Sequence, residues 1–127
     1  MRLFVVRHAE AAPGEPDELR PLTDAGRAAA RALGGRLAEV GVDAVVTSPL
    51  LRARETGEAI ARGAGLDAEP DERLAPGASA EDVRAAVDGR GASVVAVGHQ
   101  PDCSKIVQEL TGRKVPFAPG AVFEVDL

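Results

Sequence analysis

Two short apolar runs, each followed by a histidine, constrain the fold of this chain more than any other feature. Leu3–Val6 is followed one residue later by His8, and Ser93–Val97 is followed one residue later by His99. Apolar runs of this length, rich in β-branched residues, are typical of strands buried on both faces of a sheet. No other histidine occurs in the chain. We therefore expect both imidazoles at the carboxyl ends of strands, where α/β proteins bind ligands.

Helical periodicity between these runs predicts an α/β fold. Thr23 is a good N-cap, and the apolar residues after it recur at helical spacing up to Gly41: Ala25, Ala29, Leu33, Leu37 and Val40. Ser48 is expected to cap a second helix over 49–62, a capping box at 79–82 opens a third, and a fourth covers 101–111. Further strands are expected at 42–47, 66–70 and 121–127. Strands alternating with helices indicate a single three-layer domain, residues 1–127, with a mostly parallel sheet flanked by helices.

Composition narrows the classes of partner and compartment. The chain has 127 residues and a net charge of −5, which argues against nucleic acid because DNA and RNA surfaces need clustered basic residues. The single cysteine, Cys103, rules out an internal disulfide and suits a reducing compartment. No signal peptide or membrane-spanning run is apparent. We expect a cytoplasmic protein without membrane contact, and its oligomeric state stays open, with a monomer favoured.

The cationic residues near the two histidines predict an anion site. Arg7 precedes His8, and Arg52 lies one turn into a helix whose side chains lean toward its N-terminus. A metal site is not expected, because no closely spaced histidine pair exists. Cys103 does not fit a thiolate phosphatase, because Glu109 stands where the phosphate-binding loop of such an enzyme needs arginine. A nucleotide-binding P-loop motif is absent.

Four short blocks, taken together and in order, resemble the histidine phosphatase superfamily, which includes phosphoglycerate mutases and histidine acid phosphatases. The blocks are Arg7–Glu10, Arg20–Thr23, Ser48–Thr56 and Gly98–Pro101. The resemblance covers the chain from Arg7 to about residue 112. The small size and the lack of any insertion that could form a cap are similar to the SixA-type phosphohistidine phosphatases. The implied fold is phosphoglycerate mutase-like without a cap.

The resemblance also implies roles for site residues. His8 would attack phosphorus to form a covalent phosphohistidine, which water then hydrolyses. Arg7, Arg52 and His99 would clamp the transferring phosphoryl group, and Arg20 would add a further arginine to substrate binding. Neither a metal nor another cofactor is implied.

Two positions depart from the family's pattern. Ala9 stands where the family usually has glycine, which leaves the mechanism intact if Ala9 has a negative φ. The acid that larger members carry is missing from Arg73–Pro76. The proton donor stays open between Glu72, Asp102 and none, and Glu10 either orients His8 or is a solvated surface residue.

The sequence therefore predicts a metal-independent phosphatase that removes phosphate from phosphohistidine in proteins. A second possibility is a phosphatase of small phosphorylated metabolites with the same pocket. A third, from a different class, is a non-catalytic module that binds phosphorylated partners. The presence of a nucleophile in the set argues against the third possibility, since a pure binder does not need one.

Overall fold

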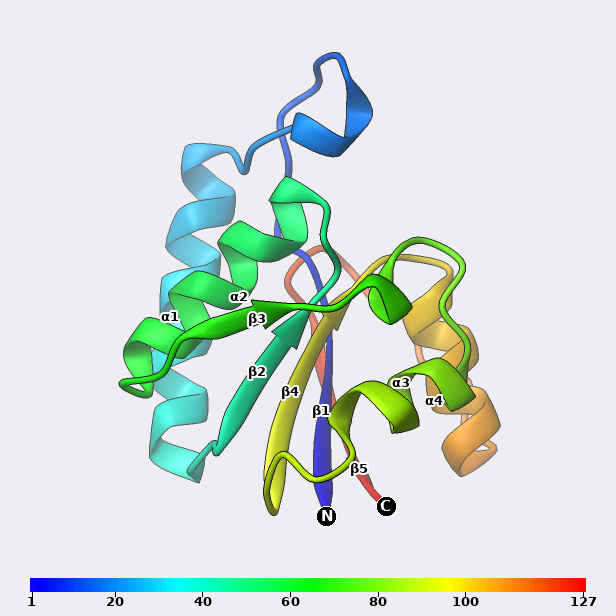
Figure 1. Cartoon of the computed structure of the whole chain (residues 1–127). Coiled ribbons are helices and arrows are strands. Elements are labelled where there is room, and N and C mark those ends of the chain that lie inside the picture. The colour runs from blue at the N-terminus through cyan, green and yellow to red at the C-terminus, as the bar shows by residue number, and fades with distance from the viewer.

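A computed structural model describes all 127 residues, Met1–Leu127. Strands and helices alternate along the chain, with two short 3₁₀ helices, η1 and η2, in the connections (Figure 1). In chain order the elements are β1 (Arg2–Arg7), η1 (Asp17–Leu19), α1 (Asp24–Val40), β2 (Ala44–Thr47), α2 (Leu51–Gly63), β3 (Ala68–Pro70), η2 (Glu72–Leu74), α3 (Ala80–Val87), β4 (Ser93–Gly98), α4 (Asp102–Thr111) and β5 (Val122–Asp126).

The five strands form one sheet in the order β3-β2-β4-β1-β5. The pairs β2/β3, β2/β4 and β1/β4 are parallel, and only β5 runs antiparallel, at the edge beside β1. The carboxyl ends of β1, β2 and β4 consequently meet at one edge of the sheet, and η1 projects beyond that edge (Figure 1). The predicted mostly parallel sheet is confirmed.

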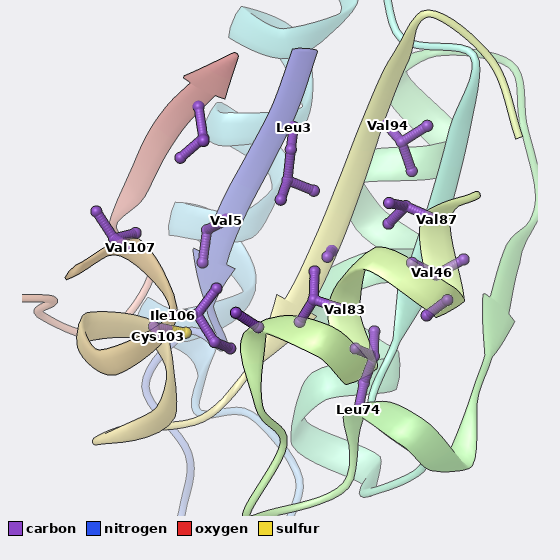
Figure 2. Close-up of a cluster of buried hydrophobic side chains, with 14 of the residues drawn as sticks. Leu3, Val5, Val46, Leu74, Val83, Val87, Val94, Cys103, Ile106 and Val107 are labelled. Atoms are coloured by element: carbon purple, nitrogen blue, oxygen red, sulfur yellow. The ribbon is translucent and has the colours of Figure 1, made fainter. Parts of the chain in front are cut away.

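Helices cover both faces of the sheet, which explains why the central strands are apolar without alternation. On β1, Phe4 and Val6 pack in a cluster with residues of α1 and α2, whereas Leu3 and Val5 pack in a second cluster with residues of α3 and α4. Figure 2 shows the second cluster, in which the α3 and α4 side chains meet those of β1, β2 and β4. The three inner strands β1, β2 and β4 thus bury both faces, and the three-layer α/β arrangement is confirmed.

Several helix boundaries follow the predicted caps. The Thr23 side chain accepts a hydrogen bond from the Gly26 N–H at the start of α1. Ser79 and Asp82 form the predicted reciprocal capping box of α3. Gly112 ends α4 in the left-handed conformation, at a φ of 77°. These local signals are therefore obeyed in the fold.

The apolar residues whose spacing predicted α1 do not all lie on its buried face. Ala25, Ala29 and Val40 are exposed, and the stripe runs through the neighbouring small residues instead. The buried residues of α1 are Gly26, Ala30, Leu33, Gly34 and Leu37. A Cβ at Gly34 would lie 2.8 Å from the Ala59 carbonyl oxygen of α2. The lack of a side chain at Gly34 therefore allows α1 and α2 to approach closely.

Candidate active site

Sheet register brings the two histidines together. In the parallel β1/β4 ladder, Arg7 pairs with Gly98, so the residues that follow leave the sheet side by side. The His8 N–H donates to the Gly98 carbonyl at 3.0 Å, which extends this contact beyond the strands. The two imidazole centroids lie 5.3 Å apart, with the rings tilted by 58°. The predicted juxtaposition of His8 and His99 at the carboxyl edge is therefore what the structure contains.

The His8 ring is held in a defined tautomer. Its Nδ1 lies 2.7 Å from the Ala9 carbonyl oxygen. A carbonyl only accepts, so Nδ1 carries the proton and the lone pair of a neutral ring is on Nε2. Burial lowers the pKa of His8, and the nearby Arg52, Arg7 and Arg20 lower it further, against the opposing effect of the Ala9 hydrogen bond. Neutral His8 is therefore available as a nucleophile below neutral pH.

Ala9, which replaces the family's usual glycine, was expected to be harmless if its φ is negative, and this is the case. No residue other than glycine has a positive φ, so Ala9 has an ordinary backbone conformation. Its side chain is fully buried, and its N–H donates to the Thr56 hydroxyl at 3.0 Å. The extra methyl group is accommodated without backbone strain.

His99 is buried and bonded to a serine. Its Nε2 lies 2.7 Å from the Ser48 Oγ, and only 5% of the residue is exposed. Burial lowers the pKa of His99 to about 4, with further lowering by His8 and Arg52. His99 is thus a neutral, orientationally fixed ring at neutral pH.

Ser48 does not cap α2 as predicted. The helix begins at Leu51, two residues later than expected, and its N-cap position is Leu50. The Ser48 hydroxyl accepts a hydrogen bond from the Leu50 N–H at 3.2 Å and forms a second hydrogen bond with His99. A hydrogen bond to a buried imidazole and a tight turn take the place of the cap. Sequence reasoning missed this contact, although the position directly after β2, at the same sheet edge, was a signal for it.

Arg52 and Arg20 converge on one carboxylate. The Arg52 guanidinium donates to the Asp17 carbonyl oxygen at 2.9 Å through Nη1 and to Asp17 Oδ2 at 3.2 Å through Nη2. Arg20 donates through Nη1 to Asp17 Oδ1 at 3.1 Å and through Nε to the Ala12 carbonyl at 2.9 Å. The hydrogen bonds from Arg20, and then those from Arg52, lower the pKa of Asp17. Asp17 was not among the predicted residues; its spacing of three from Arg20 within a turn-rich loop was the available signal.

Arg7 reaches the segment that precedes β5. Its Nη1 donates to the Phe117 carbonyl oxygen at 2.9 Å, and its buried Nε has no hydrogen-bond partner. The Gly120 N–H in turn donates to the carbonyl oxygens of Arg7 and His8. The segment from 117 to 121 therefore braces the end of β1, while Arg7 keeps unused N–H groups for an anion.

The remaining block residues support the loop that carries Arg20. Glu55 accepts from the Leu22 N–H at 2.8 Å and from Arg27 at 3.2 Å. The Thr56 hydroxyl donates to the Arg52 carbonyl oxygen at 2.8 Å while it accepts from the Ala9 N–H. Helix α2 thus links the loop after β1 to the loop before α1.

None of the carboxylates considered as proton donors forms a hydrogen bond or an ion pair with either histidine. Glu72 is exposed on η2, and Asp102 accepts from the Gly77 N–H at 2.8 Å. Asp102 and His99 both line a small, mainly apolar hollow. Glu10 accepts from the Thr23 hydroxyl at 2.7 Å rather than from His8, so of its two predicted alternatives the structure favours the surface role.

Two other groups have no part in the site. Cys103 is buried, and burial raises the pKa of its thiol to about 12, which leaves no thiolate for catalysis. No three histidine, cysteine, aspartate or glutamate side chains are grouped closely enough to hold a metal ion.

None of the helices combines the length and apolar character that crossing a bilayer would need.

Comparisons with known proteins agree with this geometry. The histidine phosphatase superfamily (branch 1) matches residues 3–76. An uncharacterized protein of Picosynechococcus sp. is 39% identical over 116 residues, which cover 80% of this chain and 68% of that protein. The protein histidine phosphatase SixA, solved in complex with tungstate, superposes with a TM-score of 0.85 at 29% identity, over 100% of this chain and 88% of that one. A mycobacterial glucosyl-3-phosphoglycerate phosphatase shares the fold, with a TM-score of 0.73 at 19% identity over 97% and 88% of the two chains.

Proposed function

Because this chain belongs to the histidine phosphatase superfamily and has a SixA-like fold, we propose that it is a metal-independent phosphatase of phosphohistidine in proteins. The observation that carries the proposal is the His8 ring: its Nδ1–H is bonded to the Ala9 carbonyl, and its Nε2 is free beside three arginines and a second histidine. A nucleophile with its lone pair pre-oriented has no use in a module that only binds phosphate.

The first chemical step transfers the phosphoryl group to His8. The Nε2 lone pair attacks phosphorus, and the bond from phosphorus to the leaving atom breaks with its electron pair going to that atom. Arg7 and Arg52 offer N–H donors to the phosphoryl oxygens, and Arg20 and His99 complete the clamp. Preorganised donors of this kind stabilise charge that spreads over the oxygens in the transition state.

The second step returns the enzyme to its starting state. Water attacks the phosphorus of phospho-His8, the P–N bond breaks toward Nε2, and inorganic phosphate and a proton are released. The neutral form of His8 is favoured by its lowered pKa, so it is again a nucleophile after each turnover.

Phosphohistidine is the favoured substrate because no proton donor is in place. The pKa of Asp17 is lowered by its arginine partners, which keeps it ionised, and neither Asp102 nor Glu72 is hydrogen-bonded to a histidine. An alkyl phosphate expels a strongly basic alkoxide, for which a general acid normally contributes roughly 10²–10⁴-fold. Imidazole leaves without such help. A small phosphorylated metabolite with an alkyl leaving group is therefore the less suited substrate.

The test is a comparison of kcat/KM for a phosphohistidine peptide, an aryl phosphate and a phosphoserine peptide, with chelator present throughout. We expect the rates to fall steeply in that order, and His8→Ala to remove both turnover and covalent labelling by the phosphohistidine donor. Equal rates for the aryl and serine phosphates would reveal a proton donor and favour the metabolite phosphatase. Undiminished activity of His8→Ala would place the nucleophile elsewhere.

A further inference from the structure

Of the three arginines in the candidate site (Arg7, Arg20 and Arg52), two form ion pairs, and Asp17 is the carboxylate in both. Its two oxygens lie 3.1 Å from Arg20 Nη1 and 3.2 Å from Arg52 Nη2. Its side chain is 60% exposed, whereas that of Arg52 is 9% exposed. One side of the carboxylate is therefore held by the arginines, and the other is open to molecules that enter the pocket.

A fixed negative charge at this place is unfavourable for an ordinary phosphate ester. The phosphoryl oxygens and the Asp17 carboxylate need the same N–H groups of Arg20 and Arg52. When an oxygen ester is cleaved, negative charge also develops on the leaving oxygen. Repulsion from Asp17 thus acts on the bound ester and increases as the bond breaks.

A leaving group that carries positive charge reverses this effect. In-line displacement places the leaving group on the side of phosphorus opposite the attacking nitrogen of His8. Element η1, which carries Asp17, projects beyond the carboxyl edge of the sheet, on the open side of the site (Figure 1). The protonated ring of a phosphohistidine there brings an N–H donor to a carboxylate, which gives a charge-assisted hydrogen bond while the P–N bond is intact or partly broken.

Resting on the proposed phosphohistidine phosphatase activity, we propose that Asp17 is a specificity-determining residue that selects phosphoramidates whose ring is protonated in the substrate over phosphate esters. Asp17 accepts a hydrogen bond from the distal ring N–H of the substrate phosphohistidine and keeps that nitrogen protonated. The His8–phosphorus bond forms as the substrate P–N bond breaks, and the electron pair of that bond returns to the ring nitrogen. The product ring is neutral imidazole with its proton on the distal nitrogen, so no proton donor is consumed.

A purely structural role for Asp17 is distinguishable from this one. If Asp17 only held Arg20 and Arg52 in place, its loss would slow every substrate by a similar factor. If its charge selects the leaving group, the two classes of substrate respond in opposite directions. Glu18 is the matched control, because it is the adjacent residue of η1, has the same charge and forms no ion pair with an arginine.

The experiment measures kcat/KM of wild type, Asp17→Asn and Glu18→Gln with phosphoimidazole and with p-nitrophenyl phosphate. The asparagine keeps the size of the side chain and a carbonyl oxygen for the arginines. We expect the phosphoimidazole to p-nitrophenyl phosphate ratio to fall roughly tenfold or more in Asp17→Asn, with the ester rate rising, and to stay unchanged in Glu18→Gln. Equal losses for both substrates in Asp17→Asn, or equal ratios in the two variants, would overturn the proposal.

The wild-type protein separates this outcome from the proposed function. If wild type hydrolyses neither a phosphohistidine peptide nor phosphoimidazole faster than the ester, the proposed function fails, and this inference falls with it. If wild type prefers the phosphoramidates and Asp17→Asn keeps that preference, only the inference fails. Inhibition by inorganic phosphate gives an independent readout, since removal of the Asp17 charge should strengthen phosphate binding and Glu18→Gln should not.

Discussion

Both histidines of the site are kept neutral, and each is fixed through a different atom. The proton on His8 Nδ1 is held by a backbone carbonyl, which leaves Nε2 for chemistry. On His99 it is Nε2 that is occupied, by the buried Ser48 hydroxyl. The His8 ring therefore has a free lone pair on Nε2, while the His99 ring is held in place by its hydrogen bond to Ser48. The division of roles between the two imidazoles follows from these single hydrogen bonds.

Burial of His99 as a neutral ring predicts that the protein loses stability as the pH falls. Its pKa is about 4 in the folded chain and ~6.5 when unfolded, so the unfolded chain binds more protons between these values. The free energy of unfolding should decrease as the pH is lowered from 6.5 toward 4, by about 3 kcal/mol from this residue.

Urea unfolding at pH 7 and pH 5 of wild type and His99→Gln tests this expectation. Glutamine is uncharged over this range and can still bond to Ser48, so the difference between the two proteins isolates the titration of His99. The variant should lose less stability than wild type between the two pH values. The same loss in both proteins would show that other groups cause the pH dependence.

At the scale of elements, strands and caps were predictable and two functional contacts were not. The apolar runs at β1 and β4 and the caps at Thr23 and Ser79 are local signals that tertiary structure did not override. The contacts of Ser48 with His99 and of Asp17 with Arg52 span 51 and 35 residues. The place of Ser48 after β2 and the spacing of Asp17 from Arg20 mark both residues, but the partner of each across so many residues is visible only in the fold.

Helix α1 shows the same limit for packing. Its sequence allows two adjacent stripes of small and apolar residues, and periodicity alone chose the one that includes Ala25 and Ala29. The structure uses the stripe of Gly26, Ala30 and Gly34: Gly26 lies against the Glu10 backbone, and Gly34 lies against the Ala59 backbone of α2, where a side chain would not fit. The adjacent glycines Gly34 and Gly35 thus differ in their packing: Gly34 lies against α2, and Gly35 has no neighbour where a side chain would stand.

This difference predicts opposite effects of the same substitution at adjacent positions. A Cβ at Gly34 would clash with the Ala59 carbonyl at 2.8 Å, whereas one at Gly35 would meet nothing within 4 Å. Gly34→Ala should therefore destabilise the protein by roughly 1–3 kcal/mol through a forced helix shift. Gly35→Ala should stabilise it by roughly 0.5–1 kcal/mol through helix propensity.

Denaturant midpoints of the two variants and wild type measure both effects in one series. Each substitution adds one methyl group to the same helix, so every other property of the pair is matched. If Gly34→Ala were as stable as Gly35→Ala, the α1/α2 interface could not be as close as the structure has it.

At the scale of the whole molecule, the site is an open edge of a small sheet. The connections between the elements are short, and η1 with the loop around it projects farthest beyond the carboxyl ends of the strands (Figure 1). Helices cover the two faces of the sheet but not this edge. The absence of a covering insertion at this edge is what the proposed phosphoprotein substrate requires.

An open edge also predicts how the phosphoenzyme reacts. A mutase must hold its intermediate away from water until an alcohol takes the phosphoryl group, and sequestration of that kind needs a covering segment. Here no segment covers the edge at which phospho-His8 would stand, so water would reach it. Water, which is by far the most concentrated acceptor, should take the phosphoryl group in nearly every turnover.

We therefore expect the amount of inorganic phosphate released from phosphoimidazole to equal the amount of imidazole, even with glycerol or 3-phosphoglycerate present at high concentration. Both products can be quantified in the same reaction by phosphorus and proton NMR. A phosphate yield well below the imidazole yield, with a matching phosphorylated alcohol, would mean that an acceptor is bound at this edge and that the enzyme is a phosphotransferase.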